Sequence, residues 1–450
     1  MGECSPPAPV RVVSRRTVKP PPRARERIPL TTWDVAMLSA DYIQKGLLYA
    51  PPPFSTARLL DHLQAALADA LVAYYPVAGR FATESGDGCC SVFIDCDGQG
   101  VDILHAVADG VAIADAIPPD ADVPPLVRSF FPLDGAVNHD GHHLPLFVVQ
   151  VTDLADGVFV GFAYNHALSD GTAFWDFLNA WAGIARDGEA AFRFQPPPLL
   201  ERWEQVVVNK RDDLTGMVER LSPPPLRERM LHFSAESLAA LKERARQELL
   251  AAGDEAGAAA VTRFQALSSL VWRSVTRARR LAPDQPTVCR AAANNRARLR
   301  PPLPPEYFGN TIYPVSTEAV RAGELLERGH GWAAAAVGRA VAAHTDEAIR
   351  ARVAAWTASP VLYTLRYFDP SGVMMGSSPR FPMYGCDFGW GKPLAARSGR
   401  ANKMDGKASL YPGRDDGGID AELVLTPQHM ALLEQDQEFW AAVTPDKKPY

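Results

Sequence analysis

The stretch FVGFAYNHALSDGTAFWDFLNAW, residues 159–181, changes character in its middle and decides the fold of the region around it. Its first part is apolar in the manner of a buried strand, and its last part is apolar on nearly every side, which indicates a buried helix. Between the two, His166 and Asp170 stand four positions apart, and Gly171 follows at once. The sequence therefore predicts a strand-to-helix turn, a place where side chains reach into clefts.

Both polar residues of this turn have a structural and a functional explanation. Asp-Gly-Thr before a buried helix is a good N-cap, because the Asp170 carboxylate accepts bonds from the first-turn amides. His166 is either a satisfied core residue or a general base, since a neutral imidazole can take a proton from a hydroxyl or amine that attacks a carbonyl. No GxSxG elbow and no nearby third ligand accompany the pair. Neither a serine triad nor a metal site is therefore expected.

Two further stretches combine glycines, aromatic residues and charges. In YGCDFGWGKP, residues 384–393, the glycines indicate a tight backbone path, and Asp387 is either a buried ion-pair partner or an acid–base group. In NNRARLRPPLPPEYFGN, residues 294–310, Arg296 and Arg298 alternate as residues on one face of a strand do. Buried arginines need carboxylate partners, and Asp170 and Asp387 are the candidates; exposure to solvent is the alternative.

The composition excludes several classes of protein. A chain of 450 residues is too long for one compact core and suggests two domains. The net charge of −6 argues against nucleic acid as a partner, and no apolar run is long enough to span a membrane. The six cysteines lack paired spacing, which predicts reduced thiols and a cytoplasmic location. We expect a basic first strand near residues 10–20 rather than a transit peptide, and a monomer.

Strand and helix patterns alternate irregularly, which predicts an α/β fold of the α+β kind. We expect an N-terminal domain at residues 1–190, a proline-rich crossover loop at 191–228 and a C-terminal domain at 229–450. Leucines at helical spacing predict a helix from residue 55 to 74, and the "ADG" at 155–157 predicts a hairpin. The run AAGDEAGAAA, residues 251–260, is read as a small-residue loop, and NHDGHH, residues 138–143, as a solvated one.

Taken together, these stretches resemble the plant BAHD acyltransferases. The family's HxxxDG motif is present from His166 to Gly171, and its DFGWG motif from Asp387 to Gly391. The stretches LTTWD (30–34), YYPVAGR (74–80), FQALSSLVWR (264–273), YFGN (307–310) and YPGRDDGGIDAELVLTP (411–427) fit the family in order. The resemblance implies two similar chloramphenicol-acetyltransferase-like domains, with mixed sheets flanked by helices and a channel between them.

The resemblance also implies an activity. It predicts transfer of a hydroxycinnamoyl, acetyl or similar acyl group from a coenzyme A thioester to an alcohol or amine of plant specialised metabolism. Acyl-CoA is then a co-substrate, with no bound cofactor and no metal. His166 is the expected general base, Asp387 is sometimes given a catalytic part, and Asp170 is expected to pair with Arg296, or failing that Arg298. The other scaffold residues that carry over are Gly171, Asn310, Phe388, Gly389, Trp390 and Gly391.

Two departures from the family pattern bear on its branch. Asn165 stands where many members have a second histidine, and Thr311 follows YFGN where malonyl-transferring members often have cysteine. Neither changes the expected mechanism. An elimination enzyme on the same scaffold and a non-catalytic small-molecule binder are the alternatives. Peptide-synthetase condensation domains share HxxxDG, but DFGWG favours the plant family. The residues that bind coenzyme A are not assigned.

Overall fold

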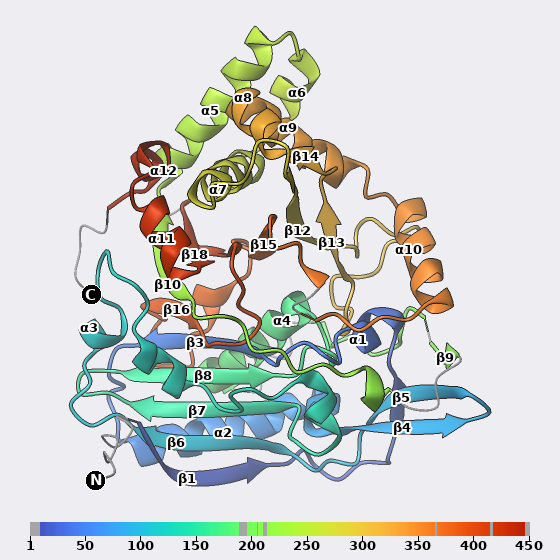
Figure 1. The fold of residues 1–450 in the computed structure, drawn as a ribbon. Helices are drawn as coiled ribbons and strands as arrows, with labels where there is room; N and C mark the ends of the chain where they lie inside the picture. Colours follow the sequence, from blue (N-terminus) through green and yellow to red (C-terminus); the bar gives the residue numbers. More distant parts are fainter. Residues whose placement is uncertain are drawn as a thin grey trace, which may run out of the picture.

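The computed structural model describes residues 10–188, 196–204, 206–209, 214–364, 367–414 and 417–445. The chain forms two halves, each built on a six-stranded mixed sheet, and these lie one above the other in Figure 1. The strand orders are β1-β6-β7-β8-β3-β16 in the N-terminal sheet and β10-β18-β17-β15-β12-β13 in the C-terminal sheet. The expected α/β architecture with two sheet-bearing halves is therefore confirmed.

The N-terminal sheet contains β1 (Arg11–Val18), β3 (Ile43–Tyr49), β6 (Val101–Val107), β7 (Phe147–Asp153), β8 (Val158–Tyr164) and β16 (Ala395–Ser398). A smaller sheet beside it contains β2 (Arg27–Pro29), β4 (Arg80–Gly86), β5 (Cys89–Asp95) and β9 (Val208–Asn209). The helices of this half are α1 (Thr32–Ala36), α2 (Thr56–Ala73), α3 (Ile113–Ala116) and α4 (Gly171–Asp187). The edge strand β16 thus comes from the C-terminal part of the sequence and pairs with β3.

Helices α2 and α4 form the core of this half together. The predicted helix at residues 55–74 is confirmed, because Ser55 caps α2 and accepts a bond from the backbone of Arg58. The apolar stripe of α2 is buried against α4, and Trp181 Nε1 donates to Leu63 O over 3.1 Å. The predicted hairpin is also present as β7 and β8. This packing fixes the position of α4, and therefore of the turn that precedes it.

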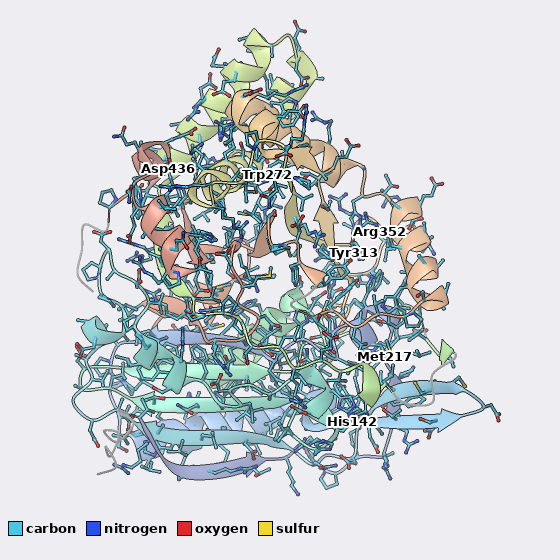
Figure 2. All side chains as sticks on the ribbon, viewed as in Figure 1. His142, Met217, Trp272, Tyr313, Arg352 and Asp436 are labelled. Atoms are coloured by element: carbon cyan, nitrogen blue, oxygen red, sulfur yellow. The ribbon has the colours of Figure 1, made fainter. Side chains whose placement is uncertain are left out.

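The C-terminal sheet contains β10 (Arg227–Phe233), β12 (Cys289–Asn294), β13 (Ile312–Ser316), β15 (Val373–Ser377), β17 (Lys407–Pro412) and β18 (Ile419–Leu425), and β11 (Pro286–Thr287) pairs with β14 (Val320–Arg321). The helices of this half are α5 (Ala235–Ala251), α6 (Glu255–Ala260), α7 (Arg263–Ala278), α8 (Ala322–Glu327), α9 (Gly329–Ala342), α10 (Asp346–Ala358), α11 (Pro427–Leu433) and α12 (Gln437–Ala442). Figure 2 shows Trp272 of α7 inside this upper half, where its Nε1 donates to Thr287 Oγ1.

The two faces of the C-terminal sheet differ in chemistry. Ala408 and Leu410 of β17 belong to the apolar core that the helices cover. Because side chains alternate along a strand, Lys407, Ser409 and Tyr411 point to the opposite face. Across from Ser409 stands Glu422 of β18. The face away from the helices is therefore polar.

Two local predictions were wrong. Residues 251–260 were expected to form a loop, but α6 occupies most of them. Asp254 caps this helix by accepting from Gly257 N, and the alanines that follow favour helix. The proline-rich stretch LSPPPLRERM, residues 221–230, was expected to hold no regular structure, yet β10 begins within it at Arg227. Among the described residues, no helix is long and apolar enough to cross a membrane.

Candidate functional site

The turn between β8 and α4 holds His166 and Asp170, and its aspartate is the predicted N-cap. Asp170 Oδ1 accepts from the backbone nitrogens of Thr172 and Ala173 at 3.1 and 3.2 Å. Asp170 is fully buried, whereas His166 is half-buried. The carboxylate is thus engaged with the helix start rather than with the imidazole.

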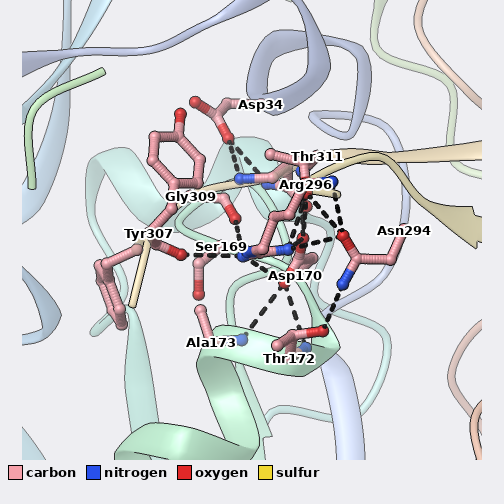
Figure 3. A network of polar contacts seen from close by, with 12 residues as sticks. Asp34, Ser169, Asp170, Thr172, Ala173, Asn294, Arg296, Tyr307, Gly309 and Thr311 are labelled. Carbon is pink, nitrogen blue, oxygen red and sulfur yellow. Dashed lines mark hydrogen bonds and ion pairs between the residues drawn. The ribbon is translucent and has the colours of Figure 1, made fainter. Parts of the chain in front are cut away.

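A buried ion pair ties this cap to the C-terminal half (Figure 3). Arg296 donates to both oxygens of Asp170, at 2.7 and 3.1 Å, and to the carbonyls of Tyr307 and Gly309. Thr311 N also donates to Asp170 Oδ2, over 3.0 Å. The expected pairing of Asp170 with Arg296 is confirmed.

The setting of the two arginines differs from the expectation. β12 ends at Asn294, so Arg296 and Arg298 lie in a turn and not on one face of a strand. The guanidinium of Arg298 does not contact Asp170. Its NH1 donates instead to the carbonyls of Val341 and His344. The alternation Arg-Ala-Arg has the period of a strand, but residues 296–298 form a turn after the end of β12.

Gly171 permits a close approach between the halves. A Cβ on this glycine would lie 2.9 Å from Cζ of Phe381, a distance that real Cβ atoms do not show. The ring of Phe381 therefore closes over the helix start from the C-terminal half. Any larger residue at position 171 would push this ring away from the turn.

The backbone of His166 is fixed on both sides by amide side chains. His166 N donates to Asn138 Oδ1 over 2.7 Å, and Asn310 Nδ2 donates to His166 O over 2.7 Å. Asn165 Nδ2 donates to Asn138 O, so the residue that departs from the histidine pair has a structural part. Asn138 is fully buried at the start of a 3-10 helix, Asn138–His142, and the expected solvated loop at residues 138–143 is wrong for this residue.

The same amide determines which imidazole nitrogen carries the proton. Asn310 Nδ2 is committed to two acceptors, His166 O and Asp34 Oδ1, so Asn310 Oδ1 is the atom that faces the ring. His166 Nδ1 lies 3.1 Å from it and must donate. The lone pair is consequently on Nε2. Within the described part of the chain this nitrogen has no hydrogen-bond partner and is not sealed from solvent.

Burial is the main cause that lowers the pKa of His166 below its ordinary value of 6.5. A hydrogen bond of the ring to its own backbone, the nearby carboxylate of Asp170 and the bond to Asn310 oppose this effect, and the ammonium of Lys407 adds to it. A histidine with a lowered pKa is neutral at pH 7. The ring therefore presents an unprotonated Nε2 to any molecule that reaches it.

Sequence reasoning missed the carboxylate behind this arrangement. Asp34 is fully buried, accepts from both nitrogens of Asn310, and accepts from Thr31 in a capping box at α1. The buried guanidinium of Arg202 lies 3.8 Å from the other oxygen of Asp34. The local sign of this residue is the stretch LTTWD, which indicates a helix cap. The contact of Asp34 with Asn310 is visible only in the fold.

The DFGWG segment forms a separate structure. Asp387 Oδ1 accepts from the backbone nitrogens of Gly389 and Gly391, at 2.9 and 3.0 Å, and both glycines have positive φ. Asp387 is half-buried, and in the described residues it forms no ion pair with an arginine. The expectation that it could pair with Arg296 or Arg298 is therefore wrong, because its carboxylate closes its own turn.

This segment docks on the helices of the N-terminal half. Phe388 is buried, meets the ring of Trp181 edge-on at 4.8 Å and stacks on Trp390 at 5.8 Å. His62 Nε2 contacts Phe388 O at 2.9 Å. Trp181 lies ten residues after Gly171 along α4, which is about 15 Å at 1.5 Å per residue. The structure brings Asp170, Arg296 and Asn310 to His166 and leaves DFGWG at a distance.

No group of three or more histidine, cysteine, aspartate or glutamate side chains in the described ranges is arranged to hold a metal. The site thus consists of one base, His166, and the polar network that orients it.

Comparisons with known proteins agree with this architecture. The family described as the transferase family matches residues 8–440. An uncharacterized acetyltransferase of Arabidopsis thaliana is 35% identical over 425 residues, which cover 92% of this chain and 94% of the relative. BAHD acyltransferase DCR of the same plant is 33% identical, over 96% and 92%. The chain belongs to the BAHD acyltransferases.

Other comparisons agree with the assignment of the chain to the BAHD acyltransferases. The shikimate O-hydroxycinnamoyltransferase of Nicotiana tabacum is 29% identical and covers 83% of the chain and 86% of the relative. The crystal structure of vinorine synthase has a TM-score of 0.74 at 21% identity, over 97% and 99% of the two chains. F. sporotrichioides TRI101, complexed with coenzyme A and T-2, has a TM-score of 0.73 at 18% identity, over 93% and 99%. The two solved structures share the fold of this chain.

Proposed function

We propose that this acyltransferase moves an acyl group from a coenzyme A thioester to the hydroxyl or amine of a small molecule, with His166 as general base. The observation that carries the proposal is the orientation of the imidazole: Asn310 accepts from Nδ1, which leaves the lone pair on Nε2. The lowered pKa of His166 keeps this nitrogen unprotonated near neutral pH. TRI101, which shares this fold, was crystallised in complex with coenzyme A, and that complex supports the choice of donor.

The described residues of the site supply one base and no nucleophile, so in this scheme the acceptor itself attacks the thioester. His166 Nε2 takes the proton of the acceptor O–H or N–H as that atom attacks the thioester carbonyl. The tetrahedral intermediate breaks its C–S bond, and the imidazolium returns the proton to the departing thiolate. Asp34 and Asn310 hold the tautomer throughout, and Asp170 with Arg296 holds the turn. Asp387, Phe388, Gly389, Trp390 and Gly391 act as structure in this scheme.

Acceptor-dependent thiol release tests the proposal. The purified full chain is incubated with acetyl-, benzoyl- and p-coumaroyl-CoA, with and without a panel of alcohols and amines, and free thiol is measured. We expect release that depends on an acceptor and falls about 10²–10⁴-fold in His166→Ala. The exposed His143 offers a matched control, because His143→Ala removes the same ring outside the site. Release without acceptor, or none with any donor, contradicts the proposal.

A further inference from the structure

Three lysines from both halves of the chain gather between the two sheets. Lys45 belongs to β3, Lys407 begins β17, and Lys403 precedes β17 by four residues. Lys45 reaches across to Tyr411 of β17, with Nζ 2.7 Å from the hydroxyl and 4.3 Å from the ring centroid. We call Lys45, Lys403 and Lys407 the lysine cluster.

In the part of the chain that the structure describes, one member of the lysine cluster, Lys403, has carboxylate partners. Lys403 is buried and donates to both Glu228 and Glu422, the latter over 2.9 Å. Glu422 is further occupied, because it also accepts from the hydroxyls of Ser398 and Tyr411. The two carboxylates are thus already engaged with Lys403 and with neutral donors.

Lys45 and Lys407 have no such partner among the residues that the structure describes. Among the described residues no carboxylate oxygen lies within 4.0 Å of either ammonium, since neither lysine takes part in an ion pair there. Within the described ranges, Lys45 donates only to the Tyr411 hydroxyl, and Lys407 only to the carbonyl of Asn402 over 2.7 Å. An ammonium carries three donors, so two remain unused on each.

These half-buried charges are costly as they stand. Burial, together with Lys407 and Lys403, lowers the pKa of Lys45 to about 7, although Glu422 opposes the shift. Burial likewise lowers the pKa of Lys407 to about 8, with Glu422 and Asp41 opposing it and Lys403 adding to it. An anion between the two ammonium groups would offset this cost. Without such an anion, an apolar side chain at either position would give a more stable fold.

The position of Lys407 is fixed by contacts between the two halves. Asn402, whose carbonyl receives Lys407, adopts a positive φ of 57°. Asn402 N donates to Asp41 Oδ2, Asn402 Nδ2 donates to Asp41 O, and Asp41 N donates to Asn402 Oδ1, all within 3.0 Å. This reciprocal pairing joins the halves and holds the acceptor carbonyl over the lysine, so that Lys407 is pre-oriented.

Lys407 also lies near the base. Its charge contributes to the lowered pKa of His166, and its Cε is 3.2 Å from the place where a Cβ on Gly376 would stand. Gly376 belongs to β15, which leads through residue 377 to Phe381 over the start of α4. The charge of Lys407 therefore acts on the base, and β15 connects the surroundings of this lysine with the start of α4.

We propose that the substrate of this acyltransferase carries a carboxylate, which Lys45 and Lys407 bind while the reacting group faces His166. The inference rests on the proposed function, because it names the class of molecule that the same site takes. The carboxylate belongs either to the acceptor, as in a hydroxy acid, or to the acyl group, as in a dicarboxylic acyl-CoA. Each of the two ammonium groups donates to it with hydrogens that are otherwise unused.

The test compares acids with their uncharged analogues on the full chain. In the acceptor arm, shikimate and 4-hydroxybenzoate are compared with their methyl esters, with p-coumaroyl-CoA as donor. In the donor arm, succinyl-CoA is compared with butyryl-CoA on one neutral alcohol. The quantity measured is the ratio of kcat/KM for the acid to that for its analogue, which cancels any loss of folded protein. Lys45→Met, Lys407→Met and, as a matched control, Met at the exposed Lys19 are compared with the unaltered chain.

We expect a ratio of at least about 10 in one arm, since a charge-assisted hydrogen bond contributes about tenfold or more. The ratio should fall to within about threefold of one in Lys45→Met and Lys407→Met and stay unchanged in Lys19→Met. If transfer occurs without preference for an acid in either arm, the carboxylate proposal is overturned and the proposed function stands. An equal rise in KM for every acyl-CoA in Lys407→Met also overturns it, because the lysine then serves a phosphate of coenzyme A.

A binding measurement separates this inference from the proposed function. If no thiol release is found with any donor, thermal unfolding is recorded with the same acids and esters. A rise in melting temperature with an acid, absent with its ester and lost in Lys407→Met, supports the carboxylate site without acyl transfer. Equal shifts, or no shift with any acid, overturn it.

Discussion

The free energy of unfolding should respond sharply to the loss of the Asp170 carboxylate. Asp170 is fully buried and meets Arg296 at 2.7 Å, the α4 amides at 3.1 and 3.2 Å, and Thr311 N at 3.0 Å. Removing one member of a buried ion pair costs about 3–5 kcal/mol, and loss of an N-cap adds about 1 kcal/mol. Asp170→Ala should therefore cost about 4–6 kcal/mol, a large part of the 5–15 kcal/mol that holds a domain folded.

Asp170→Asn should cost less than Asp170→Ala, because the amide oxygen can still cap α4. Urea unfolding, followed by tryptophan fluorescence and by circular dichroism, measures both variants. A double-mutant cycle then isolates the pair. Asp170→Ala combined with Arg296→Met should show a coupling of about 2 kcal/mol or more, whereas the combination with Arg298→Met should be additive within about 0.5 kcal/mol. Equal coupling for the two arginines would refute the assignment of Arg296 as the partner, and so would a cost below about 1 kcal/mol for Asp170→Ala.

Three further predictions concern activity. Because burial lowers the pKa of His166, its active neutral form persists as the pH falls toward 6.5, and kcat/KM should decline with a midpoint below 6.5; a midpoint above 7 would contradict this. Asn310→Ala frees the imidazole to take the other tautomer, so kcat should drop about 10-fold or more at near-constant KM, which steady-state kinetics records. Asp387→Asn keeps an acceptor for Gly389 N and Gly391 N, so its kcat should stay within about threefold of the unaltered chain. A loss of 10²-fold there would instead make Asp387 an acid–base residue.

The features predicted from sequence are those with local causes. Helix α2 follows from leucines at helical spacing behind Ser55, and the cap of α4 follows from Asp-Gly-Thr. The hairpin of β7 and β8 follows from its turn residues. Each of these depends on residues that are close together in the sequence. These features can therefore be predicted from the sequence alone.

The features that the sequence could not predict come from contacts between distant segments. Asn138 and Asp34 lie 28 and 132 positions before His166, and nothing in their local sequence indicates that they orient it. Arg296 was placed on a strand because alternation within a short run does not distinguish a strand from a turn. The choice of Asp170 as its partner came from the family resemblance and not from spacing.

The pairing of β16 with β3 has a consequence for synthesis on the ribosome. The other five strands of the N-terminal sheet are complete once Tyr164 has been made, but Ala395 follows about 230 residues later. At 5–20 residues per second, roughly 10–50 s pass during which the edge of β3 has no partner. An open strand edge is a site for pairing with another chain. The nascent protein is therefore exposed to aggregation at this edge until Ser398 has emerged, and a chaperone that covers β3 in this interval should raise the yield of folded enzyme.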